Sequence, residues 1–256
     1  MPRRVDRQYL RHVTYATPGG LLARTSMYEY QRPKIDLDGR RLVDIGCGPG
    51  RYLTAVRRRG AQVVGLDLSA GMLQSLGSDG KPAAAVADAA ALPVAGRASD
   101  VVLACHMLYH LADPQAALDE VRRVLVPGGI FVATVIGPGH LQEIDQMWMP
   151  LIAAAGLDTD EPDLGLRNHH LPGDVLEELL RSRFVDVQRR DLVSAVVVSD
   201  PAPVFNHATT TTGVQTAAQA VPGLPGQLHD RLAERIKKDG EFRLTTSVSL
   251  FSAHAA

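Results

Sequence analysis

A loop with three closely spaced glycines could bring the backbone against a ligand. Gly46, Gly48 and Gly50 follow an apolar run in the stretch VDIGCGPG at 43–50. Glycine has no Cβ, so it can take positive φ and leave room for a ligand beside the chain. The segment after the loop is predicted to be a helix, whose first N–H groups lack partners. We therefore expect a nucleotide-like cofactor at the end of a buried strand.

Three aspartates stand at the ends of successive apolar runs. Asp44 precedes the first glycine, Asp67 closes the next run, and Asp88 follows the one after it. A carboxylate at Asp67 could accept hydrogen bonds from ribose hydroxyls, and one at Asp88 from an adenine amino group. Each acid could instead cap the helix that follows it. Three such acids beside a glycine loop favour the cofactor interpretation.

The spacing of the glycines distinguishes between cofactors. Dinucleotide-binding loops carry G-x-G-x-x-G, whereas this loop reads G-x-G-x-G and has Arg51 where the last glycine would stand. An acid as close as Asp44 disfavours phosphate and suits a cationic or hydrogen-bond-donating group. S-adenosylmethionine carries an ammonium and a sulfonium but no phosphate, so we expect it in preference to NAD. Asp67 alone does not separate the two cofactors.

Apolar strands alternate with amphipathic helices along the chain. This alternation predicts an α/β fold with a doubly wound, mostly parallel sheet and helices on both faces. The last segment alternates between apolar and polar residues, as an antiparallel strand would. Strands are predicted at 41–46, within 61–69 ending at Asp67, within 83–93 ending near Asp88, within 99–111 before a turn, and at 127–136, 185–200 and 240–254. Helices are predicted at 51–60, after Ser69, at 114–125 and at 172–184.

Four segments, in this order, resemble the class I S-adenosylmethionine-dependent methyltransferases, in particular the small-molecule branch with a type 11-like domain. They are VDIGCGPGRYL, VVGLDLSAGML, VADAAALP and SDVVLACHMLYHLADPQAALDEVRRVLVPGGIFVAT. The resemblance is tight over 40–136 and looser in the C-terminal third. It implies a Rossmann-like, seven-stranded sheet with a reversed last strand. It also implies a cofactor lying across the ends of the first, second and fourth strands.

The resemblance further implies roles for single residues. The first two loop glycines would contact the methionine part of the cofactor, Asp67 would hold its ribose, and Asp44 would act partly through water. Side chains after the second and third strands would flank the adenine and read its edge. The end of the fourth strand would line the side facing the sulfonium. The cofactor-binding residues expected are Arg24, Tyr28, Asp44, Gly46, Cys47, Gly48, Gly50, Asp67, Leu68, Met72, Asp88, Ala89, Ala104 and Cys105.

The stretch CHMLYH at 105–110 holds the catalytic candidates. His106 follows the predicted fourth strand, and Tyr109 and His110 come one turn later. Methyl transfer is an in-line displacement that needs a base only if the acceptor loses its proton early. A histidine here could instead pack under the sheet edge with a ring nitrogen bonded to the backbone. No third ligand is evident near the two histidines, so we expect no metal site.

Segments outside the sheet are expected to cover the site. An N-terminal helical lid at 1–34 would bring Arg24 and Tyr28 to the carboxylate of the cofactor, or pack them onto the sheet. The cofactor-binding core is predicted at 35–136, with a possible substrate cover inserted at 137–171. Residues 172–256 would complete the core, including a helical segment at 201–239.

One aromatic residue in the predicted insertion allows two interpretations. Trp148 lies between Met147 and Met149. These side chains could line an apolar acceptor pocket. They could equally form the core of a small subdomain.

Composition narrows the functional classes. The chain has 256 residues and a formal net charge of −1, which argues against nucleic acid as the main partner. Its apolar runs are too short to span a membrane. Its two cysteines, Cys47 and Cys105, suit a reduced, cytoplasmic setting and are expected to lie near each other after neighbouring strands.

The leading hypothesis is a methyltransferase that acts on a small-molecule acceptor, in specialised metabolism, as a monomer or homodimer. An RNA or protein methyltransferase is one alternative, and it would need a basic face. The other alternative is a non-catalytic module that binds S-adenosylmethionine. The glycine spacing disfavours an NAD-dependent oxidoreductase.

Overall fold

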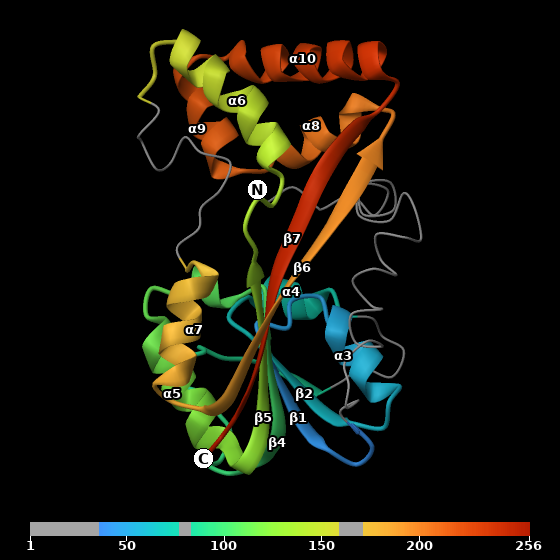
Figure 1. Cartoon of the computed structure of the whole chain (residues 1–256). Helices are drawn as coiled ribbons and strands as arrows, with labels where there is room; N and C mark the ends of the chain where they lie inside the picture. The colour runs from blue at the N-terminus through green and yellow to red at the C-terminus, as the bar shows by residue number, and fades with distance from the viewer. Residues whose placement is uncertain (1–35, 77–82, 159–170) are drawn as a thin grey trace. The chain divides into compact units, whose positions relative to one another are not determined.

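The computed structural model describes residues 36–76, 83–158 and 171–256. The chain divides into two compact units (Figure 1). The core unit contains the described residues of Ile35–Pro138, His169–Leu192 and Val248–Ala256, and the helical unit those of Gly139–Asn168 and Val193–Ser247. The predicted lid at 1–34 lies outside the described residues.

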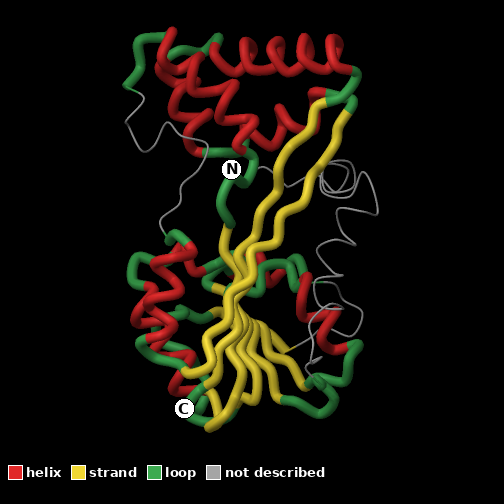
Figure 2. The backbone as a smooth tube through the Cα atoms, viewed as in Figure 1, coloured by secondary structure: helices red, strands yellow, loops and turns green. Residues whose placement is uncertain are grey.

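A mixed sheet has the strand order β3-β2-β1-β4-β5-β7-β6 (Figure 2). The described strands are β1 (Arg41–Ile45), β2 (Gln62–Asp67), β3 (Ala83–Val86), β4 (Ser99–Cys105), β5 (Leu125–Ile136), β6 (Val185–Val198) and β7 (Phe242–His254). β1 pairs in parallel with β2 and β4, as β2 does with β3 and β4 with β5. β7 runs antiparallel to β5. The predicted seven-stranded sheet with a reversed last strand is confirmed.

Helices of the core unit cover both faces of its sheet. They are α3 (Arg51–Arg57), α4 (Ala70–Gln74), α5 (Pro114–Val124) and α7 (Gly173–Arg181), with a short 3-10 helix η2 (Leu108–His110). One buried cluster joins the sheet to α5 and α7, and a second joins its other face to α3 (Figure 1). The sheet is therefore doubly wound, as predicted.

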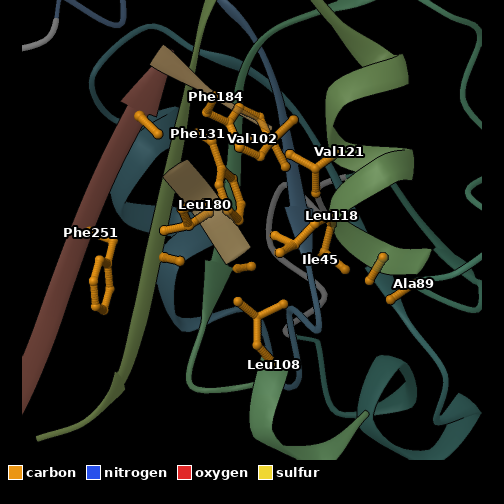
Figure 3. Packing of buried hydrophobic residues seen from close by; sticks show 14 of the residues in the cluster. Ile45, Ala89, Val102, Leu108, Leu118, Val121, Phe131, Leu180, Phe184 and Phe251 are labelled. Carbon is orange, nitrogen blue, oxygen red and sulfur yellow. The ribbon is translucent and has the colours of Figure 1, made fainter. Parts of the chain in front are cut away.

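Strand β4 shows how an apolar run builds both clusters. Val102 and Ala104 belong to the cluster with α5, whereas Val101, Leu103 and Cys105 belong to the cluster with α3. Successive side chains of a strand point to opposite faces, so a run without polar residues buries both faces. Figure 3 shows Val102 within the first cluster.

Helix α5 begins where its sequence predicts. Asp113 is the N-cap, and its Oδ1 accepts hydrogen bonds from the N–H groups of Gln115 and Ala116 at 2.9 and 3.2 Å. Pro114 occupies the first turn, where no intrahelical N–H bond is lost. The helix buries one apolar stripe against the sheet, including Leu118 and Val121, both labelled in Figure 3.

The helical unit has a hydrophobic core of its own. Its helices are α6 (Gln142–Ala154), α8 (Pro201–Thr209), α9 (Thr212–Ala220) and α10 (Leu224–Asp239). Trp148 is fully buried in this core, and Met147 and Met149 pack against it. Of the two interpretations of Trp148, the structure supports the core of a small subdomain. No helix in the described part of the chain is long and apolar enough to cross a membrane.

Candidate functional site

The predicted cofactor loop connects β1 to α3. Its glycines all have positive φ, of 66° at Gly46, 54° at Gly48 and 81° at Gly50. A Cβ on Gly46 would lie 2.6 Å from the Cβ of Met107, so the loop packs closely on the segment after β4. A Cβ on Gly48 would meet no described atom within 4 Å. The loop thus combines a tight turn with an open stretch of backbone that a ligand can approach.

Asp67, the last residue of β2, fixes the conformation of this loop. Its Oδ2 accepts a hydrogen bond from the N–H of Gly48, and its Oδ1 one from the N–H of Ser69, each at 2.8 Å. The N–H of Gly46 donates to the carbonyl of Leu66 at 2.7 Å. A carboxylate offers about four acceptor sites. Asp67 can therefore hold the loop and still accept from the hydroxyls of a ribose.

Asp44 is a buried acid without a partner. It lies in β1 with 1% of its surface exposed, and neither carboxyl oxygen has a hydrogen-bond partner among the described residues. Burial, and then the negative charge of Asp67, raises the pKa of Asp44 to about 8. Leaving a polar group buried and unpaired costs free energy. A ligand that offers this carboxyl a hydrogen-bond donor, or a cation, would recover that cost.

The two cysteines flank the same part of the sheet. Cys47 and Cys105 belong to one buried cluster, and both are free thiols. β1 and β4 pair directly, which confirms the prediction that the cysteines follow neighbouring strands. Burial, followed by the charges of Asp44 and Asp67, raises the pKa of Cys47 to about 12. The thiol of Cys47 is therefore neutral and not a nucleophile.

Exposed apolar side chains stand next to Asp67. Leu68 is 72% exposed, and Met72, on the short helix α4, is 47% exposed. Ser69 caps this helix by accepting a hydrogen bond from the N–H of Met72 at 3.3 Å. Large apolar side chains left in solvent beside a polar site suit the flat face of a base.

Asp88 and Ala89 follow β3 at the adjoining sheet edge. The N–H of Ala87 donates to the carbonyl of Asp67 at 3.0 Å, which ties the ends of β2 and β3 together. Oδ1 of Asp88 accepts from the N–H of Ala90 at 2.9 Å. The Asp88 side chain is exposed, whereas Ala89 is buried in the cluster with α5.

At the end of β4, His106 has an unusual backbone conformation. Its φ is 56°, and its N–H donates to the carbonyl and the hydroxyl oxygen of Thr134 at 2.9 and 3.1 Å. Residues other than glycine rarely adopt this conformation, and such positions gather at functional sites. Ala104 and Cys105, directly before it, are buried. The sheet therefore holds His106 firmly at the carboxyl end of β4.

The other catalytic candidates lie in η2. The rings of Tyr109 and His110 have centroids 4.6 Å apart. Burial raises the pKa of the Tyr109 hydroxyl, and His110 is exposed. The described residues contain no group of three or more His, Cys, Asp or Glu side chains that could hold a metal.

Two further residues shape the site although no sequence pattern predicts it: Met107 and Thr134. Met107 packs against the position of Gly46, and Thr134 of β5 holds the backbone of His106. Neither residue carries a local signal, because its role depends on strand pairing across the sheet. Arg24 and Tyr28 lie outside the described residues.

Comparisons with known proteins agree with this geometry. Residues 43–133 match a family model described as a methyltransferase domain. Malonyl-[acyl-carrier protein] O-methyltransferase of Salmonella typhimurium is 34% identical over 135 residues, which are 52% of this chain and 53% of that protein. Ubiquinone biosynthesis O-methyltransferase of Parvibaculum lavamentivorans is 32% identical over 167 residues, covering 56% of this chain and 63% of that protein. Over residues 43–133 the chain therefore resembles the S-adenosylmethionine-dependent methyltransferases, as the sequence predicts.

The fold agrees with that family over a longer stretch. The crystal structure of an S-adenosylmethionine-dependent methyltransferase from Archaeoglobus fulgidus has a TM-score of 0.55 at 17% identity, over 97% of this chain and 100% of that one. Similarity at this identity supports the fold alone. The chain spans between about half and two thirds of the length of the two curated methyltransferases described above.

The residues of this candidate site fit S-adenosylmethionine, the cofactor that the sequence predicts. Asp44 is an unpaired buried acceptor that suits a ligand with a cationic end. Asp67 has acceptor sites left for a ribose, and Gly48 leaves open space beside the backbone. The fit to this cofactor rests on the carboxyl acceptors of the two aspartates and on the open backbone at Gly48. A phosphate-bearing cofactor would gain nothing from a buried acid at this place.

Proposed function

We propose that this protein transfers a methyl group from S-adenosylmethionine to a small-molecule acceptor in specialised metabolism. The observation that carries the proposal is the buried, unpartnered carboxyl of Asp44 beside the glycine loop. A carboxyl in that position favours an ammonium-bearing cofactor over a phosphate-bearing one, because an ammonium stabilises the ionised form of the acid, whereas a phosphate would oppose its ionisation. The family match of residues 43–133 supports the same assignment.

The roles of the cofactor-binding residues follow from their chemistry. Asp44 would accept a hydrogen bond from the amino group of the methionine part, directly or through a water. Asp67 would accept from the ribose hydroxyls while it holds the N–H of Gly48. The exposed side chains of Leu68 and Met72 would flank the adenine. Asp88, Ala89, Ala104 and Cys105 would border the adenine edge and the sulfonium side.

When bound, S-adenosylmethionine supplies an electrophilic methyl carbon attached to a sulfonium. The protein's part is to hold the acceptor in line with that carbon and to keep water out, which can contribute about 7–11 kcal/mol in favourable cases. If the acceptor must lose a proton, a ring nitrogen of His106 is the first candidate to receive it, because its backbone is fixed by β5. Tyr109 has a raised pKa, so it would stay protonated and donate a hydrogen bond.

The relatives guide the choice of acceptors to test. Their names describe O-methylation of malonyl-[acyl-carrier protein] and O-methylation in ubiquinone biosynthesis. Oxygen acceptors, both carboxylic acids and phenols, are therefore the first class to assay. The near-neutral net charge of −1 argues against an RNA substrate.

The proposal is tested first by binding. Calorimetric titration should give a heat of association with S-adenosylmethionine and S-adenosylhomocysteine and none with NAD. Asp67→Ala should weaken binding about tenfold to a hundredfold, because it removes charge-assisted hydrogen bonds. Asp119→Ala, which removes an exposed acid on α5, is the matched control and should bind as the wild type does.

Turnover is tested with oxygen-nucleophile libraries and metabolite extracts, in which methylation adds a constant mass to the product. Absence of cofactor binding by the wild type would overturn the whole proposal. Binding without any methylated product would favour the alternative of a non-catalytic module. Methylation of RNA or protein in preference to small molecules would overturn the acceptor class.

A further inference from the structure

The loop between β3 and β4 begins with a tight turn that presents Asp88. The N–H of Ala91 donates to the carbonyl of Asp88 at 3.0 Å, and the N–H of Ala90 to its Oδ1 at 2.9 Å. Among the described residues, no group donates a hydrogen bond to Oδ2 of Asp88, and the side chain is exposed. The turn thus leaves one carboxylate oxygen ready to accept from a ligand.

Two side chains of α5 hold the backbone directly after this turn. Oε2 of Glu120 accepts a hydrogen bond from the N–H of Leu92 at 2.7 Å. Arg123 donates through Nη2 to the carbonyl of Leu92 at 3.1 Å and through Nη1 to the carbonyl of Val94 at 2.8 Å. Glu120 and Arg123 therefore bind both polar groups of one residue and a carbonyl two positions on. We call this pair the α5 clamp.

The clamp is rigid because its two members also bind each other. Nε of Arg123 donates to Oε1 of Glu120 at 2.6 Å, and Nη2 donates to Oε2 at 2.7 Å. A two-point arginine–carboxylate pair has a fixed planar geometry that a lysine does not reproduce. The pair lowers the pKa of Glu120, mainly through the hydrogen bond from Arg123, so the acid stays ionised at neutral pH.

The end of α5 fastens the rest of the same loop. The N–H groups of Arg97 and Ala98 donate to the carbonyls of Arg123 and Val124, both at 2.9 Å. These carbonyls would otherwise lack partners at the helix end. Within the loop, Ala89 is buried in the cluster that contains Leu118 and Val121 of α5, and Figure 3 shows all three. One helix therefore sets the position of the whole connection.

We propose that the α5 clamp positions Asp88 and Ala89 against the adenine of the cofactor, and so sets the preference of the protein for an adenine base. The inference rests on the proposed function, because it needs S-adenosylmethionine in the site. Glu120 and Arg123 touch the loop and not the ligand, so both are positioning residues. Their effect reaches the ligand through the backbone of Leu92, which follows the Asp88 turn.

The preference has a simple chemical origin. Adenine carries an amino group that can donate to the free carboxylate oxygen of Asp88. Hypoxanthine carries a carbonyl oxygen at that position, and two acceptors facing each other repel. A fixed Asp88 would reject the wrong base strongly, whereas an Asp88 on a loosened loop could turn away and reject it weakly.

The experiment compares two ligands by calorimetric titration: S-adenosylhomocysteine and its inosine analogue. The variants are Arg123→Ala, Arg123→Lys and the control Arg122→Ala. Arg122 is an exposed arginine on the same turn of α5, and its side chain has no hydrogen-bond partner in the described part of the chain. Both alanine variants lose one positive charge, but only Arg123→Ala opens the clamp.

The wild type should prefer the adenine ligand, by about tenfold or more, and Arg122→Ala should keep that ratio. Arg123→Ala should weaken the binding of S-adenosylhomocysteine about tenfold. It should also bring the ratio of the two dissociation constants close to one. Arg123→Lys should fall between, because an ammonium can donate to one carbonyl but cannot form the two-point pair.

The ratio separates positioning from general stability. Partial unfolding of a variant would weaken the binding of both ligands equally and leave the ratio of their dissociation constants unchanged. A wild-type ratio retained in Arg123→Ala would overturn the clamp while leaving the proposed function intact. A wild type that binds neither ligand would overturn the proposed function, and the clamp with it. A wild type that binds both equally would overturn the clamp, because there would be no adenine preference for it to set, while leaving the proposed function intact.

Discussion

The buried carboxyl of Asp44 makes the protonation state of the ligand-free protein depend on pH. Its carboxyl is buried in β1 without a partner, next to a loop held by the charge of Asp67. Ionising such a group in the interior is unfavourable, so the folded protein retains the proton to a pH of about 8. An ammonium placed against the carboxyl would favour its ionised form and release the proton. The buried acid thus destabilises the ligand-free protein and favours the binding of a cationic ligand.

The first prediction concerns pH and the free energy of unfolding without ligand. The pKa of Asp44 is raised from 3.8 to about 8 by folding, so the folded state binds more protons between these values. The contribution of Asp44 to stability is complete below the lower value and is lost as the pH rises to the upper one. The slope is at most about 1.4 kcal/mol per pH unit for this single group.

Urea denaturation of Asp44→Asn across that window measures the effect. The variant should lose less stability than the wild type as the pH rises, because its amide does not titrate. Asp119→Asn, which changes an exposed acid on α5, is the control and should keep the wild-type slope. Equal slopes in the wild type and Asp44→Asn would contradict the assignment of the buried proton.

At the scale of elements, the glycines of the loop serve two purposes: one allows the loop to pack, and another leaves space for a ligand. Gly46 faces the Cβ of Met107 at close range, so this position serves the packing of the loop on the segment after β4. Gly48 meets no described atom, and its N–H is held by Asp67. Both glycines have a positive φ, but for different reasons. Gly46 allows close packing against Met107, whereas Gly48 leaves open space for a ligand.

The second prediction separates these causes with a matched pair. An alanine at either position would cost about 1–2 kcal/mol for positive φ. Gly46→Ala should cost more, because its methyl would overlap Met107 at 2.6 Å. Gly48→Ala should lose only the stability that the backbone strain costs. It should weaken the binding of S-adenosylhomocysteine more than Gly46→Ala does, because its methyl group enters the open space beside the loop. Chemical denaturation and calorimetry measure the two effects, and equal losses of stability would refute the distinction.

At the scale of the whole molecule, the described residues form three hydrophobic clusters that share no residue, one in the helical unit and two in the core unit. The core of the helical unit surrounds Trp148 and draws on α6, α8, α9 and α10. The core unit buries its own clusters on the two faces of the sheet. Strands β6 and β7 contribute residues to both units, since the boundaries at Val193 and Ser247 fall within them. The loop and aspartates of the candidate cofactor site all belong to the core unit.

The third prediction follows from the separate cores. Trp148→Ala should lower the stability of the helical unit by about 3–5 kcal/mol, the cost of removing a buried aromatic side chain. Hydrogen exchange should speed up in α6 and α10, while amides of β1 and β4 keep their protection. Leu118→Ala in the core unit should give the reverse pattern. Uniform loss of protection in both variants would show that the two cores unfold as one.

The sequence by itself determined the kinds of element and the family that the site resembles. Apolar runs became strands, helix α5 began at Pro114, and the glycine loop followed β1, all as predicted. These features depend on backbone preferences and burial patterns of neighbouring residues, which a single segment carries within itself. The roles of the site residues remain predictions for the experiments above.

Only the tertiary structure decided which groups hold the site in shape. The bond from Glu120 to Leu92 joins residues 28 positions apart, and Thr134 reaches His106 over the same separation. Trp148 had two open interpretations until its burial assigned it to the helical core. Such contacts form when elements distant along the chain pack together. Their energies depend on the geometry of that packing, which no local pattern of residues records.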